Sequence, residues 1–363
     1  MPQSHWALSQ RQHSPSHTSS VPHLPYEGDA NEEQDKDFSV EEIRTALHSL
    51  NSRSAPGLDR VSNRALENLD DRSVQRLTEY RNDCWQRGCL PEEWKTARIL
   101  LIPKPGKAPS IDNLRPISLT SCVGKAMEHA LLNRWQAYLE QKEAFPSSII
   151  GFCPQLSTQD AMLQLKHHVL DGNAKGTRAI LGLDLESAFD KIEHSVILHQ
   201  ISRQNLGLRA YNYVKDFLTD RRVVLVAGDL QLEEQMLGST GTPQGSVISP
   251  ILFNLVMIGL AKKLQAIEDV RHSIYADDIT IWVHRGSDGH IETALQLAID
   301  TVQEYLDGTG LRCSPKKSEL LLYRPTHRDR PLGPKGMAAR TRREYEEIRL
   351  RTSNGATIPI VKR

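Results

Sequence analysis

Two adjacent carboxylates, Asp277 and Asp278, interrupt the otherwise apolar and β-prone stretch from His272 to Val283. Like charges side by side between two buried strands repel each other and lose hydration, so the arrangement is costly unless a positive charge joins it. A divalent metal ion fits this requirement best. The alternative is a tight turn whose Asp side chains cap backbone groups, which is a common use of Asp.

A third carboxylate, Asp184, ends the apolar run from Ile180 to Leu183, which predicts a buried strand. If this strand neighbours the hairpin of Asp277 and Asp278, the three acids meet at one edge of an antiparallel sheet. Carboxylates together with substrate phosphates suit Mg²⁺, and a pair of such ions serves in-line phosphoryl transfer. That reaction needs no Ser-His-Asp or Cys-His arrangement. The alternative for Asp184 is the start of a helix, because the residues after it are helix-compatible.

Basic residues near a predicted strand are candidates for phosphate binding. The strand from Thr96 to Ile102 runs into a basic loop that contains Lys104 and Lys107, and Arg115 follows. Lys104 (or Lys107) and Arg115 could converge on a triphosphate, the arginine as a planar fork and the lysine as a point charge. The alternative is that these are solvated charges at loop tips.

A glycine-rich loop, Gly238 to Ser246, holds three glycines around Gln244 and leads into a helix that we expect to begin at Ser249-Pro250. Such a loop lets another molecule approach the backbone closely. Its glycine spacing matches neither the dinucleotide-binding fingerprint nor the P-loop. The alternative is a plain helix-capping loop.

Capping signals and apolar periodicity predict the elements that position these residues. Ser39 and Glu42 have capping-box spacing, as do Ser157 and Asp160, which predicts a helix after each serine, the second reaching Leu170. Further helices are predicted from Arg72 to Arg87, from Arg209 to Asp220 and from Ile291 to Leu306. A hairpin is expected after Arg222, and the pattern as a whole indicates an α+β fold.

Composition restricts the class of protein. With 363 residues, the chain is long enough for about two or three domains or subdomains. Basic and acidic residues number 45 each, so net charge gives no global argument for a polyanionic partner. Five cysteines without a Cys-x-x-Cys pair support neither a disulfide framework nor a zinc site. The sequence lacks a signal region and a membrane-spanning run, so we expect an intracellular protein without a membrane partner.

The composition changes along the chain predict the domain limits. Residues 1–37 are rich in Ser, His, Gln and Pro and then acidic, so we expect them to be disordered. A folded region is expected over residues 38–323. Residues 324–363 are rich in Pro, Gly and Arg, which predicts a basic, partly disordered tail.

Taken in order, these motifs resemble the reverse transcriptases of non-LTR (LINE-type) retrotransposons. Three stretches resemble that family's palm: Asp184-x-x-x-Ala188-Phe189-Asp190, Thr242-Pro243-Gln244-Gly245-Ser246-x-x-Ser249-Pro250 and Tyr275-Ala276-Asp277-Asp278. Three others resemble its fingers: Ser54-Ala55-Pro56-Gly57-x-Asp59, Ile102-Pro103-Lys104-Pro105-Gly106-Lys107 and Arg115-Pro116-Ile117-Ser118. The resemblance implies the fingers and palm of a right-hand polymerase, with an antiparallel palm sheet that has helices on one face.

The resemblance implies a metal site. Asp184, Asp277 and Asp278 would be the metal-binding carboxylates, with Asp184 and Asp277 as the essential pair and the Leu185 carbonyl as a further ligand. The cofactor would be two Mg²⁺ ions, with Mn²⁺ as the alternative.

The resemblance also implies a site for nucleotide phosphates. Lys104 and Arg115 would hold the phosphates of the incoming nucleotide, joined by the backbone amides of Ser187 and Ala188. Lys317 would neutralise or protonate the departing pyrophosphate.

Three more residues would select the nucleotide. The Phe189 ring would lie under the sugar and exclude a 2′-hydroxyl by contact, which implies deoxynucleoside triphosphates as substrates. Gln244 and Gly245 would line the pocket for the nucleotide and the template.

The function implied is an RNA-directed DNA polymerase, a nucleotidyltransferase that extends a DNA primer on an RNA template. In that family a primer-grip turn and a thumb ordinarily follow the palm, so we expect a chain that ends at that turn, without a thumb or an endonuclease. The alternative is a catalytically inactive, truncated remnant with residual nucleic-acid binding. A nucleotide cyclase on a similar sheet is disfavoured, because its Gly-Gly-Asp/Glu-Glu-Phe turn is absent from the sequence.

Overall fold

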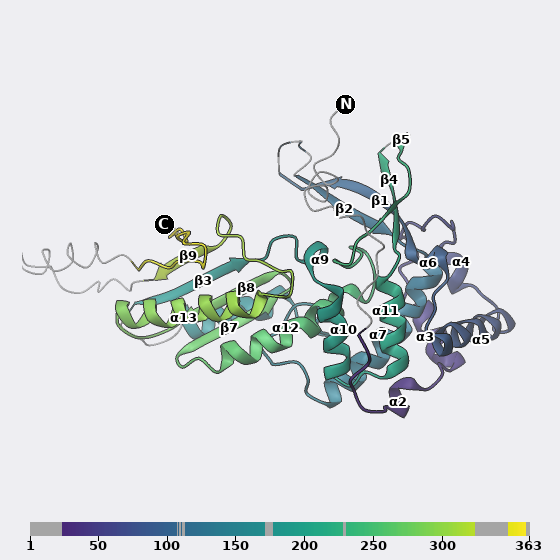
Figure 1. The fold of residues 1–363 in the computed structure, drawn as a ribbon, viewed down its shortest axis with the longest axis horizontal. Coiled ribbons are helices and arrows are strands. Elements are labelled where there is room, and N and C mark those ends of the chain that lie inside the picture. The colour runs from purple at the N-terminus through teal and green to yellow at the C-terminus, as the bar shows by residue number, and fades with distance from the viewer. Residues whose placement is uncertain are drawn as a thin grey trace, which may run out of the picture. The chain divides into compact units, whose positions relative to one another are not determined.

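The computed structural model describes residues 24–106, 108, 110, 113–170, 177–227, 230–323 and 348–360. The chain divides into two compact units. The first comprises Met1–Ala144 and Ile192–Leu252, and the second comprises Phe145–Lys191 and Phe253–Arg363. Each unit is built around a sheet of its own, and helices accompany both sheets (Figure 1). The fold therefore mixes α and β structure, as the sequence predicts.

The sheet of the first unit is mixed. Its strands are β1 (Thr96–Pro103), β2 (Leu114–Leu119), β4 (Arg222–Ala227), β5 (Leu230–Gln231) and β6 (Gln235–Met236). The order is β2-β1-β4-β5, and β6 pairs with β4. β1 runs antiparallel to β2 and parallel to β4. The predicted strand after Thr96 and the predicted hairpin after Arg222 are both confirmed.

Helices make up the rest of the first unit. They are α2 (Glu32–Asp35), α3 (Val40–His48), α4 (Asn63–Glu67), α5 (Asp71–Arg87), α6 (Glu92–Lys95), α7 (Cys122–Gln141), α10 (His194–Arg203), α11 (Leu208–Leu218) and the start of α12 (Ser249–Gln265). Ser39 and Glu42 form the predicted capping box. Trp85, Trp135 and Phe217 are almost completely buried, so large aromatic side chains fill the core of this unit.

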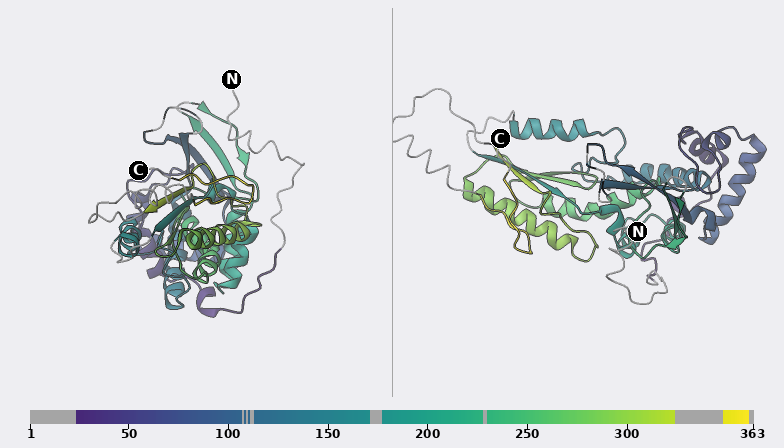
Figure 2. Two further views of the ribbon diagram at one scale, coloured as in Figure 1. Left: turned by 90° about the vertical axis from the view of Figure 1, so that its left-hand side faces the viewer. Right: turned by 90° about the horizontal axis from the view of Figure 1, so that it is seen from above.

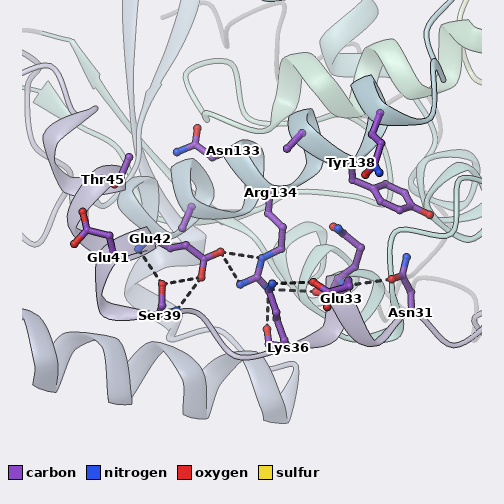
Figure 3. A pocket seen from close by; sticks show the side chains of 14 residues that line it. Asn31, Glu33, Lys36, Ser39, Glu41, Glu42, Thr45, Asn133, Arg134 and Tyr138 are labelled. Carbon is purple, nitrogen blue, oxygen red and sulfur yellow. Dashed lines mark hydrogen bonds and ion pairs between the residues drawn. The ribbon is translucent and has the colours of Figure 1, made fainter.

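The segment that was expected to be disordered, up to Asp37, is ordered where the structure describes it. Arg134, only 8% exposed, donates hydrogen bonds from its side chain to the backbone carbonyls of Gln34, Lys36 and Asp37. Its guanidinium also pairs with Glu42 at 2.8 Å (Figure 3). The prediction failed here because one buried arginine binds backbone carbonyls. Every residue has a backbone carbonyl whatever its side chain, so amino-acid composition gives no sign of these contacts.

The sheet of the second unit is entirely antiparallel. Its strands are β3 (Arg178–Asp184), β7 (Val270–Tyr275), β8 (Asp278–Val283) and β9 (Glu319–Tyr323), in the order β7-β8-β3-β9. The predicted strand before Asp184 and the predicted hairpin around Asp277 are both present. β3 pairs with β8 of the hairpin on one side and with β9 on the other. Strands that lie far apart in the sequence are therefore neighbours in this sheet.

Helices lie on both faces of this second sheet. They are α8 (Thr158–Leu165), the π-helical turn η2 (Lys166–Leu170), α9 (Ala188–Lys191), α13 (Asp288–Leu306) and the remainder of α12. α13 packs on one face, while α8 and η2 lie on the other (Figure 2). The His168 ring of η2 stacks on Trp282 of β8, with ring centroids 5.9 Å apart. The expectation of helices on one face is therefore wrong, because an aromatic contact draws η2 onto the opposite face.

The last described residues pack beside β9. The Leu320 amide donates to the Pro359 carbonyl at 2.9 Å, and Leu350 and Ile358 are buried. Residues 348–360 of the expected tail are thus part of the second unit, and residues 324–347 lie outside the described part. Within the described ranges, no helix combines the length and apolar character that a bilayer crossing requires.

Candidate active site

The backbone positions of three acidic residues lie together at one end of the second unit's sheet. β3 and β8 pair in the register that sets Asp184 opposite Asp278. Just beyond β3, the Leu185 amide donates to the Asp277 carbonyl at 3.2 Å. The expected proximity of the strand and the hairpin is therefore confirmed for the backbone that carries all three acids.

The turn that presents two of these acids is tight. Tyr275 pairs with Asp278, so only Ala276 and Asp277 connect β7 to β8. Ala276 has a φ of +55°, in the left-handed region that a two-residue hairpin turn requires and that residues other than glycine rarely adopt. The position of the carboxylates therefore depends on what supports this turn.

Support comes from the backbone at Gly151. A Cβ atom built on Gly151 would lie 2.3 Å from the Ala276 nitrogen, so only glycine allows this approach. The Gly151 amide donates to the Ile274 carbonyl, and the Gly151 carbonyl accepts from the Asn254 side chain at 2.7 Å. Gly151 cannot be singled out from the sequence, because a single glycine after two isoleucines carries no recognisable pattern.

The carboxylates repel one another. Partial burial, followed by the charges of Asp277 and Asp184, raises the pKa of Asp278 above its usual value, and Lys317 counteracts this shift. The Lys317 ammonium lies 2.9 Å from an oxygen of Asp184. One lysine therefore offsets part of the excess negative charge of the three acids.

The donor chemistry of this cluster fits a divalent cation. Hard carboxylate oxygens from two adjacent strands are what Mg²⁺ prefers, and a cation would relieve the repulsion that raises the pKa of Asp278. Among the described residues, no three His, Cys, Asp or Glu side chains already converge as a metal-binding group. Lys317, rather than a second carboxylate, is the partner of Asp184.

A partly buried thiol adjoins the carboxylates and was not singled out from the sequence. Cys313 forms an isolated antiparallel β-bridge with Leu185. Burial, together with the Asp184 and Glu186 carboxylates, raises the pKa of Cys313 to about 12. The thiol therefore stays protonated at neutral pH and adds no negative charge to the cluster.

Phe189 has a defined orientation in the second unit. Its ring packs against Phe253 at a centroid distance of 5.3 Å and edge-on against Phe152 at 6.0 Å. Just before it, Ser187 has a φ of +48°, and Ala188 is buried. The two supporting rings were not identified from the sequence, because they come from distant segments.

The predicted phosphate-binding residues lie on the β1–β2 hairpin of the first unit. Ile102 pairs with Arg115, and the Lys104 amide donates to the Asn113 carbonyl at 2.8 Å. The hairpin therefore brings Lys104 and Arg115 to the same end. Lys107 lies outside the described residues.

The loop of Gln244 and Gly245 docks on the same hairpin. The Ser118 amide of β2 donates to the Gln244 carbonyl at 2.8 Å. Gly245 has a φ of +127°, and a Cβ atom there would lie 2.6 Å from the Ser118 carbonyl oxygen. The first unit thus gathers Lys104, Arg115, Gln244 and Gly245, whereas the carboxylates, Phe189 and Lys317 belong to the second.

A cavity of about 670 Å³ lies elsewhere in the first unit, lined by residues of α2, α3 and α7 (Figure 3). Four of its charged groups form two ion pairs, Glu42 with Arg134 and Glu33 with Lys36, both at 2.8 Å, and Glu41 also lines the cavity. None of the candidate site residues lines it. The cavity therefore holds none of the residues that the family motifs single out, and the carboxylates at the end of the second unit's sheet remain the candidate site.

Comparisons with known proteins agree with the motifs. Residues 102–348 match the model of the family described as reverse transcriptase (RNA-dependent DNA polymerase). The chain is 28% identical over 285 residues to the RNA-directed DNA polymerase from mobile element jockey of Drosophila melanogaster, covering 77% of this chain and 31% of that protein. It is 29% identical over 290 residues to the probable RNA-directed DNA polymerase from transposon BS of the same species, covering 78% and 32%.

A solved structure of telomerase from Candida tropicalis in complex with a fragment of telomeric RNA is also similar, with a TM-score of 0.46 and 13% identity, covering 70% of this chain and 45% of that one. The chain spans about a third of the length of the curated relatives it matches. The resemblance to non-LTR retrotransposon enzymes is confirmed. Because the family match extends over more than half of its residues, the chain belongs to the reverse transcriptase (RNA-dependent DNA polymerase) family.

Proposed function

We propose that this chain is an RNA-directed DNA polymerase domain that adds deoxynucleotides to a primer 3′-hydroxyl on an RNA template. The observation that carries the proposal is the β3–β8 register, which sets Asp184 opposite Asp278 beside the Asp277 turn. Acids on two adjacent strands can share cations and act on one phosphoryl group. Because the chain belongs to the reverse transcriptase family, we infer that this phosphoryl transfer is nucleotide polymerisation rather than another reaction of the same class.

Asp184, Asp277 and Asp278 would hold two Mg²⁺ ions, with the Leu185 carbonyl as a further ligand. When bound, the ions would supply Lewis acidity toward the primer hydroxyl and the leaving phosphate. Lys317 would neutralise Asp184 in the metal-free protein, consistent with the 2.9 Å ion pair. Its ammonium would also neutralise or protonate the departing pyrophosphate.

The incoming nucleotide would be held through its phosphates and its sugar. Lys104 and Arg115 would bind the phosphates, together with the backbone amides of Ser187 and Ala188. Phe189 would contact the sugar, with its ring fixed by the neighbouring aromatic side chains. The Gln244-Gly245 backbone would line the pocket for the nucleotide and the template base.

Single-nucleotide incorporation by the 363-residue chain tests this function. The assay would contain an RNA template, a labelled DNA primer, one deoxynucleotide and Mg²⁺. We expect extension only by the nucleotide complementary to the template, its loss on adding EDTA, and its recovery with excess Mg²⁺. A reaction without template is the control. A folded chain that extends no primer with either Mg²⁺ or Mn²⁺ would contradict the proposal.

Replacing Phe189 with alanine should admit ribonucleotides. The ring would no longer fill the space beside the sugar C2′, so we expect the preference for deoxynucleotides to fall by about 10²-fold. The measurement is the ratio of kcat/KM for a deoxynucleotide to that for its ribonucleotide. Tyr323→Ala, which removes an aromatic ring that is 41% exposed in the same unit, should leave the ratio unchanged. Unaltered sugar selectivity in Phe189→Ala would refute the role of Phe189.

A further inference from the structure

A buried carboxylate lies beneath the loop that follows Gln244. Glu128 of α7 is only 3% exposed, and one of its oxygens accepts three hydrogen bonds. The donors are the Ser246 hydroxyl at 2.6 Å, the Val247 amide at 2.7 Å and the Ile248 amide at 3.3 Å. A buried charge is costly, so it persists only where such bonds compensate it.

A second buried charge, on Arg221, lies within electrostatic range of Glu128. Arg221 is 3% exposed, and burial lowers its pKa to about 10 while the Glu128 carboxylate opposes that shift. The guanidinium therefore remains protonated at neutral pH. One of its nitrogens donates to the Phe217 carbonyl at 3.0 Å, which ties the cation to α11. The carboxylate thus has a buried positive charge within electrostatic range, although the two groups form no direct ion pair, and its hydrogen bonds go to the loop.

The loop is fixed at its other end as well. The Ser249 hydroxyl donates to the Pro243 carbonyl at 3.1 Å, and the Ser249 amide donates to the Ser246 hydroxyl at 3.3 Å. On β2, the Ser118 amide donates to the Gln244 carbonyl at 2.8 Å. Without the Glu128 carboxylate, two loop amides would lose their acceptor.

We propose that Glu128 is a positioning residue for nucleotide selection, which fixes the Gln244-Gly245 backbone against β2, the strand that carries Arg115. This inference rests on the proposed function, in which that backbone lines the nucleotide pocket. Glu128 itself touches no substrate. It acts through Ser246 and Val247, and its carboxylate is the shared acceptor of three donors of the loop.

Glu128→Gln tests the inference, since it keeps the size of the side chain and removes its charge. We expect KM for the complementary deoxynucleotide to rise by about 10-fold, with kcat within about 2-fold of the wild type. Misincorporation should increase as well, because a displaced loop shapes the pocket less well. A role confined to stability would instead lower the melting temperature and leave KM of the folded protein unchanged.

Two further variants sharpen this comparison. Ser246→Ala removes one of the three donors and should raise KM by a smaller factor. In combination with Glu128→Gln it should add less than its separate effect, because both act on one network. The matched control is Glu140→Gln, which removes an exposed carboxylate from the same helix and should change neither KM nor fidelity.

Hydrogen exchange in the full-length chain provides a readout that needs no catalysis. The Val247 and Ile248 amides should exchange at least about 10-fold faster in Glu128→Gln, while amides within α7 keep their wild-type protection. Unchanged exchange at both amides overturns the inference, and so does faster exchange with an unchanged KM and fidelity. A wild-type chain without polymerase activity would refute the proposed function alone, and exchange would still decide whether Glu128 holds the loop.

Discussion

Replacing Asp184 with asparagine should reduce single-nucleotide incorporation by about 10³-fold or more. The amide keeps the shape of the side chain at the end of β3 but removes the charge that faces Asp278. It also removes the ionic partner of Lys317. The substitution therefore changes the electrostatics of the cluster without disturbing the strand pairing, and the measurement is the single-turnover rate at saturating nucleotide and Mg²⁺.

Stability measurements distinguish lost chemistry from lost structure. The pKa of Asp278 is raised by burial and by Asp277 and Asp184, so its ionised form destabilises the metal-free fold. Asp278→Asn should accordingly raise the melting temperature in EDTA at pH 7 while it lowers incorporation. Glu268→Gln, at an exposed carboxylate of the same unit, should change neither. Wild-type rates in Asp184→Asn would show that these acids are not the catalytic centre.

Replacing Gly151 with alanine should damage both stability and activity. The new Cβ would lie 2.3 Å from the Ala276 nitrogen and 2.9 Å from the Tyr275 carbonyl carbon, and both are backbone atoms that cannot rotate away. We expect a loss of about 3 kcal/mol in the free energy of unfolding. If the turn shifts by about 1 Å, incorporation should fall about 10²-fold.

Urea unfolding and single-turnover kinetics on the same preparation check this prediction. Gly289→Ala is the matched control, because a Cβ atom there meets nothing within 4 Å and the residue lies in the first turn of α13. That variant should be as stable as the wild type or slightly more so, since alanine favours helix. A Gly151→Ala protein with wild-type stability and rate would mean that the hairpin does not depend on the close approach of this backbone.

Local signals account for what the sequence predicted correctly. Two capping boxes, at Ser39 and at Ser157, depend on side chains three residues apart and are present as expected. The apolar run before Asp184 and the paired acids at the hairpin are equally local. Placing these acids on adjacent strands required the family resemblance, because strand order is not encoded in any single stretch.

Long-range contacts account for what the sequence did not predict. Glu128 looks like any acid on a long helix until the loop 118 residues away is seen to donate to it. Gly151 matters only because the hairpin turn comes within contact distance. Arg134 orders an acidic, polar segment whose composition indicates disorder. The Ser157 helix likewise changes to a π-helical turn at Lys166, where His168 meets Trp282.

The β3–β8 ladder makes the position of the Asp184 side chain sensitive to the length of β3 rather than to its composition. Side chains alternate between the two faces of a strand, so one inserted or deleted codon between Arg178 and Asp184 would rotate the acid to the wrong face. Point changes among the aliphatic residues of the same strand would leave its direction intact. Copies of this gene could therefore diverge widely at these aliphatic positions and keep their chemistry, yet lose it through a single three-nucleotide slip.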